Sequence, residues 1–445
     1  MHVSRPGKAL AGIVGALTLS APDSVLLTVR QADSYASPGD LVAASVSADG
    51  RYVAFASFAR LVPADTNERR DIYVLDRVSG TVTLESLSPD GRAREHDSVW
   101  PRISGDGRFV VYETMQGGAG PAPLRVIVLR DRWSSATRIL QRGEERPNRD
   151  SREPAISSDG RIVVFSSFAT NLGDGPDTNR PIEDVFSYDT STGRFETVNL
   201  ATDGRQPSSG ASFGATVNAN GRYVAFTSTS DLDASLENSH RLAFRAANVY
   251  VRDREAHVTR RISTGRNGAI PNGASYGAAV DDTGRYVAFV SEATNLVSGD
   301  GNRCPDVFLH DVQSHATILI SRSASGGSAN GASRHPAIAM NGSYVAFQSN
   351  ASDLICGSRC SDGFRDINLV SDVFLFNRTD QTISRLSTSR QVWMEPSAGP
   401  SISGNGTVVA FSSRHPIDAN DTGNDFDLFV WTDQTVMLTD RSKER

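Results

Sequence analysis

A short pattern of turn-forming and apolar residues recurs along most of the chain. Its most regular part is a glycine, a polar residue and a run of mostly β-branched or aromatic residues. Such runs are typical of β-strands that follow tight turns. Seven copies occur every 53 to 64 residues, the last two being the weakest: Gly50–Phe55, Gly107–Tyr112, Gly160–Phe165, Gly221–Phe226, Gly284–Phe289, Gly342–Phe347 and Gly406–Phe411. Self-similarity at this period indicates a repeat architecture.

Each repeat contains four short strand patterns. The first ends before a turn such as Ser47–Gly50, and the second is the apolar run itself. The third and fourth, as in Asp71–Asp76 and Thr81–Leu84, are joined by a turn rich in Ser and Gly, which is typical hairpin chemistry. Four-stranded repeats without convincing helices predict an all-β fold, a β-propeller of seven blades with four antiparallel strands each. A six-bladed ring with one degenerate repeat is the alternative. A linear β-solenoid would have shorter repeats.

The N-terminal region predicts how the ring closes. Val25–Val29 resembles the fourth strand of a repeat, and it precedes the first complete repeat. The last repeat has its own fourth strand, Thr435–Thr439. We therefore expect the N-terminal strand to pack on, or to replace, an outer strand of the last blade. The sequence leaves both possibilities open.

Composition and charge exclude several classes of protein. The 445 residues carry 45 Lys and Arg against 51 Asp and Glu, a net charge of −6, which argues against nucleic acid as a partner. The hydrophobic content of 38% supports a packed core, and no apolar run is long enough for a membrane span.

The first residues have the features of an export signal. Arg5 and Lys8 precede a modest apolar run that ends in small residues by Ala21. We predict a signal peptide or disordered leader over 1–22, one propeller domain over 23–441, a tail over 442–445 and a monomeric protein.

The repeat resembles the TolB-like module of bacterial β-propellers, which is related to WD40 repeats. The resemblance rests on S-x-D-G-R, then Y-V-A-F, then D-V-F-x-x-D, and it covers roughly residues 24–440. It implies an exported protein, periplasmic or extracellular. Propellers of this kind serve as binding platforms, assembly factors and sometimes enzyme scaffolds, so the resemblance predicts the fold better than the function.

Acidic motifs recur in the loops between the second and third strands. Asp and Asn oxygens suit calcium, and a following Asp could close each site. The alternative is that these side chains form Asx-turns within their own loops. The candidate calcium ligands are Asp65, Asn67, Asp71, Asp177, Asn179, Asp184, Asp300, Asn302, Asp306, Asp421, Asn424 and Asp427.

Two other motifs resemble catalytic sites. Ser212 and Ser275 lie in G-x-S-x-G patterns, but both occupy the same connection in successive repeats. A hydrolase nucleophile needs a strand–turn–helix elbow, so we interpret these serines as loop-fixing residues. The eight histidines do not cluster in sequence. Polyuronate lyases on propeller scaffolds use histidines from several blades, and their pattern is not reproduced here.

Three cysteines lie in neighbouring loops. Cys356 and Cys360 are predicted to form a short disulfide within one loop, as suits an exported protein. Cys304, in the equivalent loop of the preceding repeat, is the alternative partner.

The mouth of the central channel is the best candidate binding site. In a propeller, the first strand of each blade lines the channel, and the loop before it reaches the mouth. Aromatic and charged residues there suit ligand binding, although they could simply fill the channel. The candidates are Trp100, Arg152, Glu153, Phe213, Tyr276, Arg334, His335 and Glu395.

The sequence is compatible with two functions. The first is an exported binding or scaffold module for a protein, peptide or glycan, which calcium could stabilise. The alternative is an enzyme, a lyase or hydrolase, with a site built from several blades. Convergence of Glu153, His335 and Glu395 around one pocket would favour the enzyme.

Overall fold

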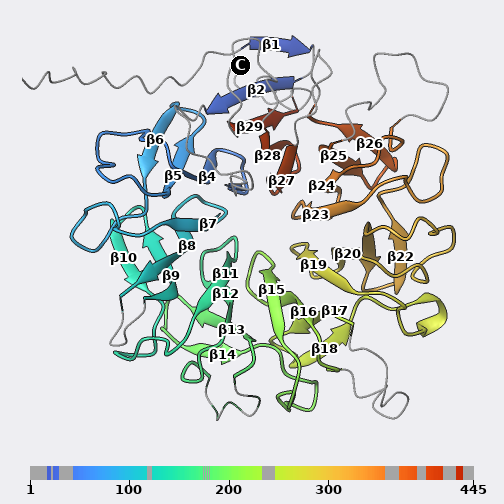
Figure 1. Ribbon diagram of the computed structural model, residues 1–445, viewed down its shortest axis with the longest axis horizontal. Helices are drawn as coiled ribbons and strands as arrows, with labels where there is room; N and C mark the ends of the chain where they lie inside the picture. Colours follow the sequence, from blue (N-terminus) through green and yellow to red (C-terminus); the bar gives the residue numbers. More distant parts are fainter. Residues whose placement is uncertain are drawn as a thin grey trace, which may run out of the picture.

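A computed structural model describes residues 18–21, 24–29, 44–117, 123–173, 175, 177, 179, 181–232, 246–355, 370–387, 397–413 and 427–433. In this part of the chain the strands form seven antiparallel sheets, six with four strands and one with five. The sheets stand around a central axis like blades, as Figure 1 shows. The predicted seven-bladed β-propeller is therefore confirmed.

The first three blades consist of β3–β6, β7–β10 and β11–β14. Their strands are β3 (Ala44–Val46), β4 (Tyr52–Ser57), β5 (Asp71–Asp76), β6 (Thr81–Leu84), β7 (Ser98–Ile103), β8 (Phe109–Gln116), β9 (Leu124–Asp131), β10 (Ala136–Ile139), β11 (Ser151–Ile156), β12 (Ile162–Ser167), β13 (Asp184–Asp189) and β14 (Phe195–Thr197).

Blades 4 to 7 continue the same order around the ring. Their strands are β15 (Ser212–Val217), β16 (Tyr223–Ser228), β17 (Asn248–Asp253), β18 (Val258–Arg261), β19 (Ser275–Val280), β20 (Tyr286–Ser291), β21 (Asp306–Asp311), β22 (Ala316–Leu319), β23 (Ser333–Ile338), β24 (Tyr344–Ser349), β25 (Asp372–Asn377), β26 (Thr382–Arg385), β27 (Ser397–Ile402), β28 (Val408–Ser413) and β29 (Asp427–Thr432). One short 3-10 helix, η2 (Arg266–Gly268), lies between blades 4 and 5.

The ring closes through the N-terminus. β2 (Ser24–Val29) pairs antiparallel with β29, and β1 (Thr18–Ala21) pairs with the outer side of β2. The N-terminal strand thus takes the fourth position of blade 7, as one of the two predicted arrangements requires. Thr435–Thr439 lies outside the described residues. β1 falls within the range that we predicted as a leader.

The glycine and the aromatic residue of the repeat contact each other across neighbouring blades. A Cβ added to Gly284 would overlap the ring of Tyr223, which begins β16 of the preceding blade. The same overlap occurs at the other turn glycines, including Gly107 and Gly342. At each, an added Cβ would overlap the first residue of the second strand of the preceding blade. These glycines have φ values from +65° to +80°, which side chains rarely tolerate. The repeat motif therefore encodes how one blade docks on the next.

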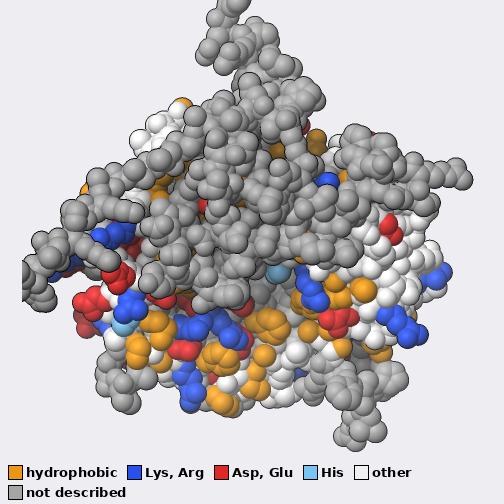
Figure 2. All heavy atoms as spheres, turned by 45° about the horizontal axis from the view of Figure 1, so that its top comes forward, with side chains coloured by type: hydrophobic (Ala, Val, Ile, Leu, Met, Phe, Trp, Pro, Cys, Tyr) orange, Lys and Arg blue, Asp and Glu red, His pale blue; other side chains and the backbone are white. Residues whose placement is uncertain are grey.

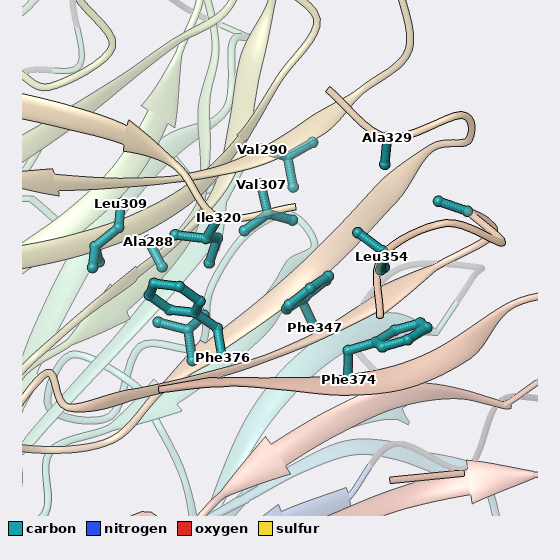
Figure 3. Packing of buried hydrophobic residues seen from close by; sticks show 12 residues of the cluster. Ala288, Val290, Val307, Leu309, Ile320, Ala329, Phe347, Leu354, Phe374 and Phe376 are labelled. Atoms are coloured by element: carbon teal, nitrogen blue, oxygen red, sulfur yellow. The ribbon is translucent and has the colours of Figure 1, made fainter. Parts of the chain in front are cut away.

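Apolar side chains fill the space between blades. Figure 3 shows the layer between blades 5 and 6, where Ala288, Val307 and Leu309 face Phe347 and Phe376. Within blade 6, Phe347 and Phe374 stack with ring centres 5.7 Å apart. Similar pairs of aromatic rings from the second and third strands occur in five further blades. Burial of these aromatic side chains between the sheets stabilises the propeller by the hydrophobic effect.

Candidate functional site

A β-bulge interrupts the inner strand of blades 2 to 7. In each, two residues of the first strand lie opposite one residue of the second, and the pairing register shifts there. The first bulged residue has a left-handed backbone, with φ between 52° and 63°. Bulges of this type normally place glycine at that position, and they turn a side chain away from the regular sheet direction. Figure 1 shows these inner strands around the central channel.

Three of these six bulges carry a side chain instead of glycine. Gly214, Gly277 and Gly399 occupy the position in blades 4, 5 and 7, and the other three blades have Trp100, Glu153 and His335. A non-glycine residue in this conformation costs about 1–2 kcal/mol relative to the ordinary backbone. All three side chains are exposed. Strained residues with exposed side chains are candidates for a functional role.

Charged residues from blades 2 and 3 form one group beside these bulges. Both nitrogens of the Arg152 fork donate to Glu183, at 2.6 Å each. Arg125 pairs with the buried Glu113 at 2.9 Å. The backbone N–H of Glu153 donates to Glu113, and the Glu153 carboxylate accepts from the N–H of Gly214 in blade 4. This network holds Glu153 in place across three blades.

Burial shifts the pKa of several groups in this network. It raises the pKa of both Glu113 and Glu183, and the arginine paired with each opposes that rise. The charge of Glu153 adds to the rise in pKa at both carboxyls. Burial lowers the pKa of Arg102, which lies in the same inner strand as Trp100. Burial therefore acts on two carboxyls and one arginine of this region, Glu113, Glu183 and Arg102.

Aromatic and basic residues from blades 5 and 6 form the second group. The Arg334 guanidinium donates to the Tyr276 hydroxyl, which in turn donates to Glu292 at 3.4 Å. The ring of His335 contacts the side-chain oxygen of Gln348 at 3.0 Å. Glu153 and His335, which the enzyme hypothesis would bring together, thus have separate partners. Phe213 is half-buried at the second position of β15, and Glu395 lies outside the described residues.

Four residues of this network were not predicted from the sequence: Arg102, Glu113, Arg125 and Glu183. Their signal lies in departures from the repeat: Glu113 stands where blades 3 and 4 have Ser166 and Thr227. This departure can be read from the aligned repeats, since Glu113 directly follows Gly107–Tyr112, but its partners on other strands cannot. Figure 2 shows side chains of both charges next to hydrophobic ones on the uncovered part of one face.

The acidic loops form Asx-turns. Asp65 accepts from the N–H of Asn67, Asp177 from that of Asn179, and Asn302 from that of Cys304. These are the bonds that the turn interpretation predicts. Asp421 and Asn424 lie outside the described residues, and Asp427 is buried at the start of β29. The buried oxygen of Asp300 has no hydrogen-bond partner among the described residues.

The aspartate that begins the third strand is hydrogen-bonded to a residue that follows the fourth strand of its blade. The Ser86 hydroxyl donates to Asp71, Ser321 to Asp306 and Ser387 to Asp372, at 2.5–2.6 Å. Each serine also accepts a backbone N–H of the third strand. Asn199 has the same role beside Asp184. Burial raises the pKa of Asp71 to about 6 and that of Asp306 to about 7.

Among the residues that the structure describes, no group of three His, Cys, Asp or Glu side chains is arranged to hold a metal ion. Calcium binding by the acidic loops stays a prediction. The Asx-turn hydrogen bonds of Asp65, Asp177 and Asn302 hold the backbone of their own loops.

Asp65→Ala is expected to lower the free energy of unfolding by about 0.5–1.5 kcal/mol, because the buried Tyr73 hydroxyl loses one of its two acceptors and keeps the backbone oxygen of Ala59 at 2.9 Å. The Tyr73 hydroxyl donates to Asp65 at 2.5 Å, and both residues are buried. Denaturant titration in EDTA measures the loss. Asp177→Ala is the control, since blade 3 has Phe186 in place of this tyrosine and only the Asx-turn is lost. A loss seen only with calcium present would support the metal hypothesis instead.

The serines of the G-x-S-x-G patterns fix the loops, as predicted. Ser212 and Ser275 are buried and hydrogen-bonded to Ser228 and Ser291 at the end of the second strand. The same pair of hydroxyls joins the strands in blades 3, 6 and 7. Within the described part of the chain, Cys304 is a free thiol. Cys356 and Cys360 lie outside the described residues, so their disulfide stays a prediction.

Comparison with known proteins identifies the fold. No protein-family profile matches the sequence, and no curated protein is similar to it in sequence. Oligogalacturonate lyase from Vibrio parahaemolyticus is similar in structure: TM-score 0.52, 14% identity, covering 95% of this chain and 98% of that one. The β-propeller domain of the Trilobed protease from Pyrococcus furiosus has a TM-score of 0.51 at 12% identity, covering 88% and 94%.

TolB from Acinetobacter baumannii is also among the similar structures, with a TM-score of 0.41 and 13% identity over 79% of this chain and 64% of that one. The chain is a seven-bladed β-propeller. At these identities the similarity establishes the fold alone. In the described part of this propeller, no helix is both long and apolar enough to cross a membrane.

Proposed function

We propose that this propeller is a binding module that holds a protein or peptide at the mouth of its central channel. The observation that carries the proposal is the set of left-handed bulges with Trp100, Glu153 and His335 where three other blades have glycine. Glycine would relieve the strain at each position. Side chains that destabilise the fold at an exposed site are explained by what they bind.

The chemistry of the mouth suits a polypeptide. Trp100 is 48% exposed, and an exposed indole supplies a large apolar contact with little loss of conformational freedom. Arg152 and Arg334 lie one position before bulged residues, and aromatic and arginine side chains dominate binding energy at protein interfaces. A glycan is the alternative ligand, because sugars also stack on exposed aromatic rings. Export and calcium stabilisation belong to the same proposal.

Trp100→Gly is expected to stabilise the fold by up to about 1 kcal/mol, because glycine accepts the left-handed backbone without strain. The same variant is expected to weaken ligand binding at least about tenfold, as for a truncated hot-spot residue. Thermal melts measure the first effect. Peptides selected on the full chain from a phage-displayed library, with a glycan array in parallel, provide the ligands for the second.

Trp133→Gly is the matched control. Trp133 is 67% exposed at the turn after β9, and its backbone is not left-handed. We expect this variant to keep ligand binding and to gain no stability. If Trp100→Gly binds the selected ligands as well as the unaltered protein does, the channel mouth is not the binding site. Ligands found only on the glycan array would favour the alternative.

A further inference from the structure

A groove of about 670 Å³ lies between blades 3 and 4, at the opposite end of the blades from the channel mouth. Arginines from both blades line it, among them Arg161, Arg222, Arg252 and Arg254. Three carboxylates also line it, and each pairs with an arginine other than Arg252: Asp189 with Arg161, Glu196 with Arg254, and Glu255 with Arg222.

Arg252 is a buried cation without a carboxylate partner among the described residues. Its exposed fraction is 2%, and its Nε atom is buried with no hydrogen-bond partner in that part of the chain. One terminal nitrogen of the guanidinium donates to the backbone oxygen of His257 and to the Thr259 hydroxyl, which are neutral acceptors. A buried guanidinium normally pairs with an anion, because its desolvation is costly. Arg252 thus has the donors for an anion that the described residues do not provide.

Blade 2 contains an arginine in the same position that does pair with a carboxylate. Arg130 occupies the matching position, and its terminal nitrogen donates to Ser135 and Thr137 as that of Arg252 does to His257 and Thr259. The Arg130 Nε, however, pairs with the carboxylate of Glu85 at 3.4 Å. The same carboxylate also accepts from Arg132 at 2.8 Å, and so bridges two arginines.

The position of Glu85 is taken by Val198 in blade 3. Both residues donate their backbone N–H to the second residue of the neighbouring third strand, Ile72 for Glu85 and Val185 for Val198. Arg254, the counterpart of Arg132, pairs with Glu196. The charge of Glu196 also acts on Arg252, but no carboxylate of the described residues lies within ion-pair distance of Arg252. The comparison of the Arg130 site with the Arg252 site therefore indicates that a carboxylate between Arg252 and Arg254 would complete the second site.

We propose that this groove binds a carboxylate from outside the chain, which takes the place that the Glu85 side chain of blade 1 has beside Arg130 and Arg132 of blade 2. The ligand is a small free acid or the terminal carboxylate of a peptide. Arg252 is its buried anchor, and the ligand lies against the other arginines of the groove.

Thermal melts of the full chain test the proposal, with glutarate at about 20 mM against sodium chloride of equal ionic strength. We expect glutarate to raise the midpoint by about 1–3 °C, since a ligand that binds only the folded state stabilises it. The peptide Ala-Ala-Ala and its C-terminal amide separate the two ligand sources. The peptide acid is expected to raise the midpoint, and the amide is not. Absence of a shift with both carboxylate probes would overturn the proposal.

Two variants locate the effect. Val198→Glu supplies the carboxylate internally, so we expect a higher midpoint without ligand and no further rise with glutarate. Leu386→Glu is the control: it is the matching buried position beside blade 7, where Trp431 and Asp433 stand in place of Arg130 and Arg132, so the midpoint should fall. Arg252→Met should also abolish the glutarate effect. A glutarate shift that persists in Arg252→Met, or a Val198→Glu variant as unstable as Leu386→Glu, would contradict the proposed site.

Discussion

Gly284→Ala is expected to lower the free energy of unfolding by about 2–5 kcal/mol, the sum of backbone strain and overpacking between blades. Gly284 has a φ of +69°, and an added Cβ would overlap the Tyr223 ring of the preceding blade. That ring cannot move freely, because it packs on the core between blades 4 and 5 and under the Arg222 guanidinium. Equilibrium denaturation measures the loss.

Gly80→Ala separates the two causes. Gly80 has nearly the same φ, +70°, but no atom of the described residues lies within 4 Å of an added Cβ. We expect this control to lose only the conformational part, about 1 kcal/mol. The difference between the two variants is then the free energy of the contact between blades. Equal losses would mean that the glycine matters for its own turn alone.

Asp71→Asn is expected to stabilise the protein by about 1–3 kcal/mol near pH 8, since one unit of pKa corresponds to about 1.4 kcal/mol. Burial raises the pKa of Asp71 to about 6, and one of its oxygens has no partner among the described residues. A raised pKa favours the folded state when the carboxyl is protonated, so its contribution is present below about pH 4 and is lost as pH rises through about 6. Asparagine has no charge to bury.

Blade 4 already has the amide at this position. Asn248 accepts from Ser263 as Asp71 does from Ser86, and its amide nitrogen donates to the backbone oxygen of Ala246. Denaturant titrations in EDTA at about pH 8 and about pH 4.5 should show the gain only at the higher value. A gain that is the same at both would exclude the charge as its cause.

Asp76→Asn is the control of opposite sign. The Arg51 fork pairs with Asp76 and holds the pKa of that carboxyl below its usual range. Stability from such a group is present above the unfolded pKa and is lost as pH falls through the folded one. This variant should therefore lose a small amount of stability at high pH, because the pair is largely a surface interaction.

The fold could be predicted in detail because its determinants are local. The Ser-x-Asp-Gly turns hydrogen-bond within four residues, as Ser47 does with Asp49, and each apolar run forms the second strand of a blade. The role of the candidate channel-mouth residues stays a prediction. Their network could not be predicted, because Glu113 and Glu183 pair with Arg125 and Arg152, which lie on other strands that the repeat pattern does not connect to them.

What the sequence by itself determined was the period, the four strands of each blade and the turn chemistry that joins them, since these depend on neighbours a few residues away. The tertiary structure decided what depends on distant residues. It placed Val408 of blade 7 against Gly50 of blade 1 and gave β2 the fourth position of blade 7. It also left Arg252, among the described residues, without the carboxylate that Arg130 has. Such contacts depend on how the sheets pack around the ring, and a one-dimensional pattern does not contain that packing.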